Sequence, residues 1–149
     1  MKRYLGIDYG LARVGIAKSD LLGFTAQGIE TINWDGEDIE TVLFRVQDLC
    51  EEFEIDEIVL GLPKRTDNRE GTAEIAAREF KLKLEERTKL PVNLQDERLT
   101  TVMATKFLQQ GTSKKSSYRS KVDQVAAEII LQGYLEKLRY KRSMETEND

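Results

Sequence analysis

The chain has 149 residues, 40% of them hydrophobic and 34% charged, and this length favours a single domain with a substantial hydrophobic core. One cysteine, Cys50, excludes an internal disulfide and fits a reducing compartment. Histidine is absent, which excludes histidine-dependent catalytic triads and histidine metal ligands. Hydrolytic chemistry would therefore have to use carboxylates, lysine, a hydroxyl group or a metal ion bound by carboxylates. No stretch has the length and hydrophobicity of a signal peptide or a membrane span, so we expect a cytoplasmic protein.

The formal net charge of −4 is distributed unevenly along the chain. Residues 35–57 carry ten acids and one base, the last five residues carry a net −3, and the remainder carries a net +8. Residues 112–121 contain four bases and no acid, and residues 64–69 contain three bases and one acid. Such segments could bind phosphates or could be solvated loops, and the charge alone favours neither interpretation.

The predicted elements follow the order βββαβαβαα. Short apolar runs favour strands at 3–9, 13–18, 28–34, 57–63 and 91–97. Apolar residues at helical spacing favour helices at 38–54, 71–89, 99–110 and 121–139. Cys50 lies on the apolar stripe of the first helix, so we interpret it as part of the core. Residues 140–149 form a polar segment that we expect to be disordered.

The order of these elements predicts the fold class. Strands that alternate with helices indicate a parallel section of sheet, and the opening hairpin with the third strand adds an antiparallel flank. The prediction is a mixed five-stranded α/β sheet with helices on both faces, formed by one domain that covers residues 1–139.

Three acids could meet at one edge of this sheet. Asp8 ends the first strand and Glu97 ends the last strand, and the carboxyl ends of strands in open α/β sheets are where ligands bind. Asp123 lies on the apolar side of its helix, because Ala126, Ala127 and Ile130 follow it at helical spacing. Three carboxylates in one concavity would repel one another unless a cation neutralised them.

Each acid also has a structural explanation that the sequence leaves open. Asp8 could cap the turn that follows it, and Glu97 could pair with Arg98 at a helix start. The sequence Ser120-x-x-Asp123 matches a capping box. Asp96 competes with Glu97, because strand periodicity does not decide which of the two faces the site.

Oxygen ligands without histidine favour the hard cations Mg²⁺ and Mn²⁺ over zinc. Two such ions, about 4 Å apart, can activate a water molecule and stabilise the leaving oxygen of a phosphodiester. The acids therefore favour a metal-dependent hydrolase of phosphodiester bonds.

Four segments carry a resemblance to a known family. GIDYGLARVGIA (6–17), VLGLPKRTDNREG (59–71), DERLTT (96–101) and VDQVAAEIILQGYL (122–135) resemble, in order, the blocks of the YqgF/RuvX family. The resemblance implies a ribonuclease H-like fold and a metal-dependent nuclease that matures the 5′ end of pre-16S rRNA in ribosome biogenesis. It also implies pre-ribosomal particles as partners, and a monomer or a homodimer.

The resemblance carries the family's acids onto Asp8, Glu97 and Asp123 and favours Glu97 over Asp96. It implies that Asp8 bridges two metal ions, while Glu97 and Asp123 each complete one coordination shell. Gly6 and Gly10 would let the backbone of the scissile phosphate come close. The basic residues that could contact phosphates are Arg13, Lys64, Arg65, Arg98, Lys114, Lys115, Arg119 and Lys121.

Several alternatives to this function remain open at this point. The family is also associated with Holliday-junction resolvase-like DNA endonucleases, and these residues do not distinguish RNA from a DNA junction. A nucleic-acid-binding domain without catalysis would share the fold and the basic segments. The Asp8-Tyr9-Gly10 turn also resembles the phosphate loop of actin/hexokinase-like ATP-binding proteins, but that architecture needs two such domains.

Overall fold

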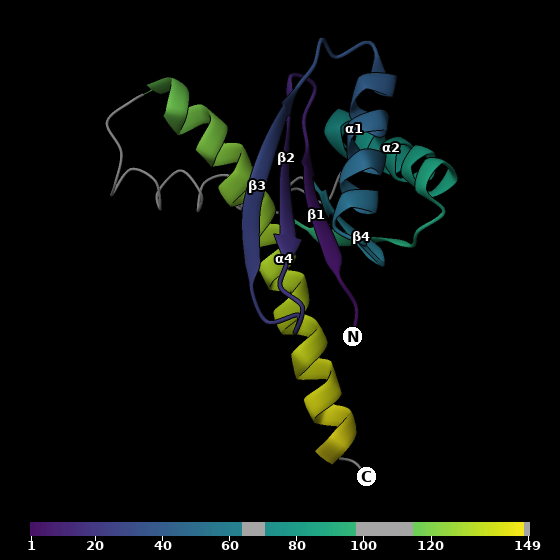
Figure 1. The fold of residues 1–149 in the computed structure, drawn as a ribbon, viewed down its shortest axis with the longest axis vertical. Helices are drawn as coiled ribbons and strands as arrows, with labels where there is room; N and C mark the ends of the chain where they lie inside the picture. Colours follow the sequence, from purple (N-terminus) through teal and green to yellow (C-terminus); the bar gives the residue numbers. More distant parts are fainter. Residues whose placement is uncertain (64–70, 98–114, 148–149) are drawn as a thin grey trace.

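The computed structural model describes residues 1–63, 71–97 and 115–147 (Figure 1). Five strands form one sheet in the order β3-β2-β1-β4-β5. The strands are β1 (Tyr4–Tyr9), β2 (Arg13–Ser19), β3 (Ala26–Asn33), β4 (Glu57–Leu62) and β5 (Val92–Asp96). The described helices are α1 (Ile39–Glu52), α2 (Thr72–Thr88) and α4 (Lys115–Glu147).

The sheet combines antiparallel and parallel pairings. β2 pairs antiparallel with both β1 and β3, while β4 pairs parallel with both β1 and β5. The predicted mixed five-stranded sheet is therefore confirmed. Its predicted strands agree with the observed ones to within two residues at each end. The predicted helix at 99–110 lies outside the described residues.

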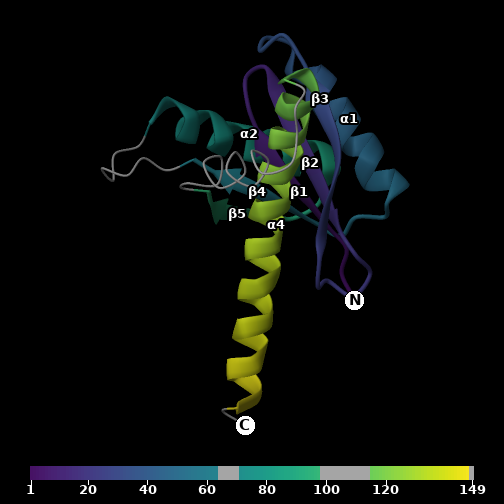
Figure 2. The ribbon, with the colours of Figure 1, turned by 90° about the vertical axis from the view of Figure 1, so that its left-hand side faces the viewer.

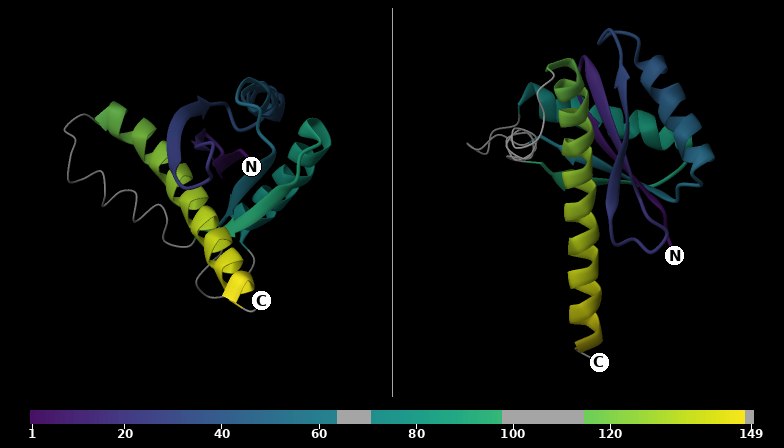
Figure 3. Two further views of the ribbon diagram at one scale, coloured as in Figure 1. Left: turned by 60° about the horizontal axis from the view of Figure 1, so that its bottom comes forward. Right: turned by 60° about the vertical axis from the view of Figure 1, so that its left-hand side comes forward.

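Helices cover both faces of the sheet, as predicted, and each face has its own apolar core. Figure 3 shows α1 and α2 on one side and α4 on the other. Leu5 and Ile7 of β1 pack with α1 and α2, whereas Tyr4 packs with α4. Because side chains alternate along a strand, Gly6 and Asp8 belong to the face that α4 covers. Among the described helices, none is both long and apolar enough to cross a bilayer.

The first helix packs its apolar stripe on the sheet as the periodicity predicts. Val42, Val46 and Leu49 are fully or almost fully buried, and Asp38 caps the helix by accepting a hydrogen bond from the backbone N–H of Glu40. Cys50 is buried in the same core. Burial raises the pKa of its thiol to about 12, so the thiol stays protonated at neutral pH.

The last helix is longer than predicted. α4 begins at Lys115 and continues to Glu147, so the expectation of a disordered segment is wrong for residues 140–147. These residues contain no glycine or proline and are mostly good helix formers, and the helix that packs on the sheet continues through them. Figure 2 shows this C-terminal part of α4 projecting beyond the sheet.

Candidate functional site

Asp8 lies at the carboxyl end of β1, on the face that α4 covers. Its register partner on β2 is Gly15, which has no side chain to fill the space beside the carboxylate. The hairpin that follows is held in place by Trp34, whose indole Nε1 donates to the carbonyl of Gly10 at 2.8 Å. The backbone N–H of Trp34 also donates to the carbonyl of Ala12, at 3.1 Å. These bonds fix the turn between Asp8 and the start of β2.

Glu97 follows β5 and reaches Asp8 across the intervening strand β4. Its backbone N–H donates to the carbonyl of Leu62 at 3.1 Å, which extends the pairing of β4 and β5 by one residue. A Cβ atom at Gly61 would lie 2.7 Å from Glu97 Oε2, so the missing side chain at Gly61 leaves the space that the Glu97 carboxyl occupies. The Glu97 carboxyl is hydrogen-bonded to that of Asp8. Asp96, by contrast, is exposed.

The contact between the two carboxyls changes their proton affinities. Burial and then the negative charge of Asp8 raise the pKa of Glu97 to about 9. Burial also raises the pKa of Asp8, and the charge of Asp123 adds to this effect, while the hydrogen bond from Glu97 opposes it. The hydrogen bond adds to the rise in the pKa of Glu97 and opposes the rise in the pKa of Asp8. Acidic groups are therefore crowded at this edge.

Asp123 lies on α4, where the helix crosses close to β2. A Cβ atom at Gly15 would lie only 2.0 Å from the backbone oxygen of Asp123, so the helix backbone rests directly on the glycine. The Asp123 carboxylate accepts a hydrogen bond from Arg13 Nε at 2.7 Å. Burial raises the pKa of Asp123, and the charge and hydrogen bond of Arg13 oppose that rise. Ala126, Ala127 and Ile130 are buried, as the helical spacing predicts.

The capping-box explanation of Asp123 does not hold. α4 begins at Lys115, so Ser120 and Asp123 lie inside the helix and not at its first turn. The hydrogen-bond partner of the Asp123 carboxylate is Arg13, which comes from another element of the fold. Helix capping therefore does not explain why Asp123 lies beside the sheet.

The side chains available as ligands fit a hard divalent cation, although they do not form a complete coordination site. Among the described residues, no three acidic or thiol side chains stand close enough together to hold a metal ion. Asp8 and Glu97 are in contact, and Asp123 is near enough for its charge to raise the pKa of Asp8. All donors are oxygens, and a cation would relieve the repulsion among them. The residues present therefore suit Mg²⁺ or Mn²⁺.

Gly15 and Gly61 were not singled out from the sequence, and they form part of how the site is built. A Cβ atom at Gly6 would lie 2.7 Å from Leu131 Cβ of α4, and one at Gly10 would lie 2.6 Å from the carbonyl oxygen of Arg13. Protein atoms therefore fill the side-chain direction at both glycines, and the approach of a phosphate to their backbone stays a prediction. Gly15 and Gly61 play the more direct part, and isolated glycines within strands are the sequence signal that points to such close approaches.

The basic residues predicted to contact phosphates are only partly covered by the structure. Arg13 opens β2 beside Asp123, with 41% of its side chain exposed. Lys115, Arg119 and Lys121 lie on the first turns of α4, where the structure describes the backbone only. The candidates outside the described residues are Lys64, Arg65, Arg98 and Lys114.

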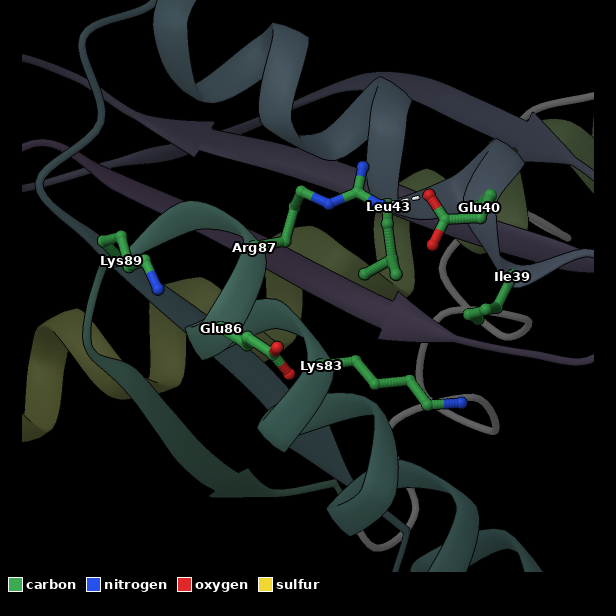
Figure 4. Close-up of a pocket in the computed structure, with 7 residues that line it drawn as sticks. All are labelled: Ile39, Glu40, Leu43, Lys83, Glu86, Arg87 and Lys89. Carbon is green, nitrogen blue, oxygen red and sulfur yellow. Dashed lines mark hydrogen bonds and ion pairs between the residues drawn. The ribbon is translucent and has the colours of Figure 1, made fainter.

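A cavity of about 510 Å³ lies between α1 and α2, away from the three acids (Figure 4). Ile39 and Leu43 contribute apolar surface to it, and the Arg87 guanidinium forms an ion pair with Glu40 across it. Two further bases and a second acid complete its lining, so its charges are mixed. We interpret this cavity as a groove between packed helices.

The raised pKa of Glu97 predicts how stability depends on pH. An acid that binds its proton more tightly in the folded protein stabilises the fold most at low pH, and this contribution is lost between its ordinary value of 4.5 and about 9. In the absence of divalent ions, we expect the wild-type melting temperature to fall across this range. Glu97→Gln, which mimics the protonated acid, should flatten the dependence. If the melting temperature of Glu97→Gln fell as steeply with pH as that of the wild type, the raised pKa of Glu97 would not be the cause of the pH dependence.

Comparisons with known proteins identify the family of the chain. Residues 2–137 match the family model described as "RuvX: Holliday junction resolvase". A Streptococcus suis protein named "Putative pre-16S rRNA nuclease" is 44% identical over 136 residues, which cover 91% of this chain and 98% of that protein. An Acetivibrio thermocellus protein of the same name is 46% identical over 135 residues, which cover 90% and 95% of the two chains.

Solved structures with low sequence identity share the fold. Thermus thermophilus RuvC, in complex with a Holliday junction substrate, has a TM-score of 0.59 at 13% identity, covering 93% of this chain and 96% of that chain. The fowlpox virus Holliday junction resolvase has a TM-score of 0.51 at 17% identity, covering 91% and 99%. The ribonuclease H-like fold class expected from the motifs is thus supported by its resolvase neighbours. Together with the family model and the curated relatives, these findings show that the chain belongs to the YqgF/RuvX family.

Proposed function

We propose that this chain is a metal-dependent nuclease that hydrolyses phosphodiester bonds during 5′-end maturation of pre-16S rRNA, in the cytoplasm. The observation that carries the proposal is the convergence of Asp8 and Glu97, with Asp123 beside them, at the carboxyl edge of the sheet. Relatives more than 40% identical over nine-tenths of the chain are named for pre-16S rRNA. Pre-ribosomal particles are the corresponding partners.

Asp8, Glu97 and Asp123 would hold Mg²⁺ or Mn²⁺ in this proposal. When bound, such ions activate the attacking water and stabilise the leaving oxygen. The chain's own contribution is to bring the acids together: β1 and β5 present Asp8 and Glu97 from the sheet, and α4 presents Asp123 from above it. Glu97 must release its proton to become a ligand, because coordination requires the carboxylate form.

The substrate backbone would be bound by basic side chains around this edge. Arg13 lies beside Asp123. The further candidates for phosphate contacts are Lys64, Arg65, Arg98, Lys114, Lys115, Arg119 and Lys121. Contacts of this kind position a nucleic acid without reading its sequence, and they make affinity fall steeply as salt rises.

A second candidate function is cleavage of a four-way DNA junction. It is supported by the description of the family model and by the shared fold of the Thermus thermophilus resolvase. The acids and the proposed metal chemistry would be the same, so only the substrate separates the two candidates.

The test compares cleavage of a 5′-extended pre-16S rRNA fragment with cleavage of a four-way DNA junction, each in Mg²⁺, in Mn²⁺ and in EDTA. We expect divalent-ion-dependent cleavage of the RNA near its mature 5′ end and complete loss of cleavage in EDTA. Preferential cleavage of the junction would favour the second function. Cleavage that persists in EDTA, or no cleavage of either substrate in either ion, would refute the nuclease proposal.

A further inference from the structure

The ion pair between Arg13 and Asp123 joins the first residue of β2 to a helix 110 positions further along the chain. Arg13 Nε lies 2.7 Å from Asp123 Oδ2. The carboxylate is only 16% exposed, whereas the arginine side chain is 41% exposed. One end of this pair is therefore enclosed near the other acids, and the other end faces solvent.

Part of the Arg13 side chain stays accessible to a second partner, because 41% of it is exposed. The hydrogen bond to Asp123 uses the Nε–H, and the two Nη groups carry four further N–H donors. Arginine can bind a carboxylate through one edge and a phosphate oxygen through another, because its donors are arranged in a fixed fork. The pair thus links an enclosed acid to the surface over which a substrate strand would pass.

From this arrangement we propose that Arg13 is the built-in counter-ion of Asp123 and exchanges with a divalent cation. When the cation binds Asp123, the guanidinium is released to bind a phosphate of the substrate strand. This inference rests on the proposed function, since it uses the same three acids. It gives Arg13 two successive partners, the carboxylate and the phosphate.

Electrostatics gives the direction of each effect. A guanidinium beside Asp123 competes with an incoming cation for the same carboxylate and repels it, so removing Arg13 strengthens ion binding by the free protein. The same removal weakens substrate binding, because one phosphate contact is lost. A purely structural ion pair would not move these two affinities in opposite directions.

The test uses Arg13→Gln, with two binding measurements that need no cleavage. Calorimetry with Mn²⁺ alone should show about fivefold tighter ion binding than wild type. Filter binding of the 5′-extended rRNA fragment in Ca²⁺, with the RNA checked to be intact, should show about tenfold weaker affinity. The slope of log affinity against log salt should decrease by about 0.7 for a single-stranded contact.

Arg3→Gln provides the matched control. Arg3 Nη1 also lies 2.7 Å from a carboxylate oxygen, that of Glu54, and its side chain is 34% exposed, but the pair sits at the opposite edge of the sheet. This variant removes the same charge and should leave both affinities unchanged. Arg13→Lys retains a charge without the fork and should give intermediate values, which also serves if Arg13→Gln does not fold.

Several outcomes would overturn the exchange. They are weaker or unchanged Mn²⁺ binding in Arg13→Gln, unchanged RNA affinity and salt slope, equal effects in the Arg3 control, or no Mn²⁺ binding by the wild type. A wild-type protein that binds Mn²⁺ and RNA but cleaves nothing would refute the nuclease proposal alone. The two binding measurements would still decide the role of Arg13.

Discussion

Asp8→Asn is expected to lower the rate of RNA cleavage by about 1000-fold or more. When several groups act together in catalysis, removing one of them loses most of the rate enhancement that they provide jointly. The substitution keeps the size of the side chain and removes the negative charge that would bind the cations. The measurement is the single-turnover cleavage rate of the 5′-extended rRNA fragment in Mg²⁺ and in Mn²⁺.

The same variant should be as stable as the wild type or more stable. Burial and the charge of Asp123 disfavour the ionised form of Asp8, and an amide in its place removes this cost. A melting temperature that is equal or higher, together with lost cleavage, would separate a catalytic role from a structural one.

Asp96→Asn is the matched control for this experiment. Asp96 lies at the same edge of the sheet and next to Glu97 in the chain, but it is exposed. We expect its cleavage rate to stay within a few-fold of wild type. Retention of a tenth or more of the activity in Asp8→Asn, or an equal loss in both variants, would contradict the assignment of Asp8.

Gly15→Ala is expected to destabilise the protein strongly and to abolish cleavage with it. The added Cβ would lie 2.0 Å from the backbone oxygen of Asp123 and 2.5 Å from its carbonyl carbon, so α4 itself must move away from β2. Overpacking against a backbone that cannot yield costs about 3 kcal/mol or more. For a domain of this size, the melting temperature should fall by about 6 to 12 °C.

Gly133→Ala offers a control on α4 itself. Among the residues that the structure describes, a Cβ atom there would meet only the Gln95 Nε2 atom within 4 Å, at 3.2 Å, and that atom ends a flexible side chain. Alanine also favours a helix interior over glycine by up to about 1 kcal/mol. Its melting temperature should be unchanged or slightly higher. If Gly15→Ala were tolerated equally well, the close approach of α4 to β2 would be wrong.

Local patterns in the sequence are sufficient to predict the sheet and the position of Asp8. Alternating apolar residues and turn residues specify the strands and place Asp8 at the end of the first one, whereas the preference for Glu97 over Asp96 came from the family resemblance. That both acids meet also depends on the order β1-β4-β5, which is set by pairing between distant segments. The Glu97 carboxyl fits above β4 because Gly61 has no side chain there, and only the packed structure shows this role of Gly61.

The contribution of α4 was harder to predict from the sequence. The spacing of Ala126 and Ala127 correctly indicates the face of the helix that packs on the sheet. The pairing of Asp123 with Arg13 depends on where the helix crosses β2, and no local pattern encodes that contact across 110 residues. The length of the helix was also not predicted. The polarity of residues 140–147 suggested disorder, but these residues have enough helix propensity for α4 to continue through them.

Crowded acids are the common physical basis of these predictions. Packing carboxyls together raises their pKa values and costs stability, and a protein without histidine has few other groups with which to bind a cation at this edge. We therefore expect divalent ions to raise the melting temperature of the wild type, through their preference for the folded state.

The most direct test of the central claim is the position of Mn²⁺ in crystals of the protein, located by anomalous diffraction. The account predicts Mn²⁺ at the carboxyl edge, with Asp8, Glu97 and Asp123 oxygens among its ligands at about 2.0 to 2.3 Å. In that structure, the Arg13 guanidinium should have left Asp123. Mn²⁺ bound only elsewhere, or an Asp123 carboxylate still held by Arg13 beside a bound ion, would contradict the account.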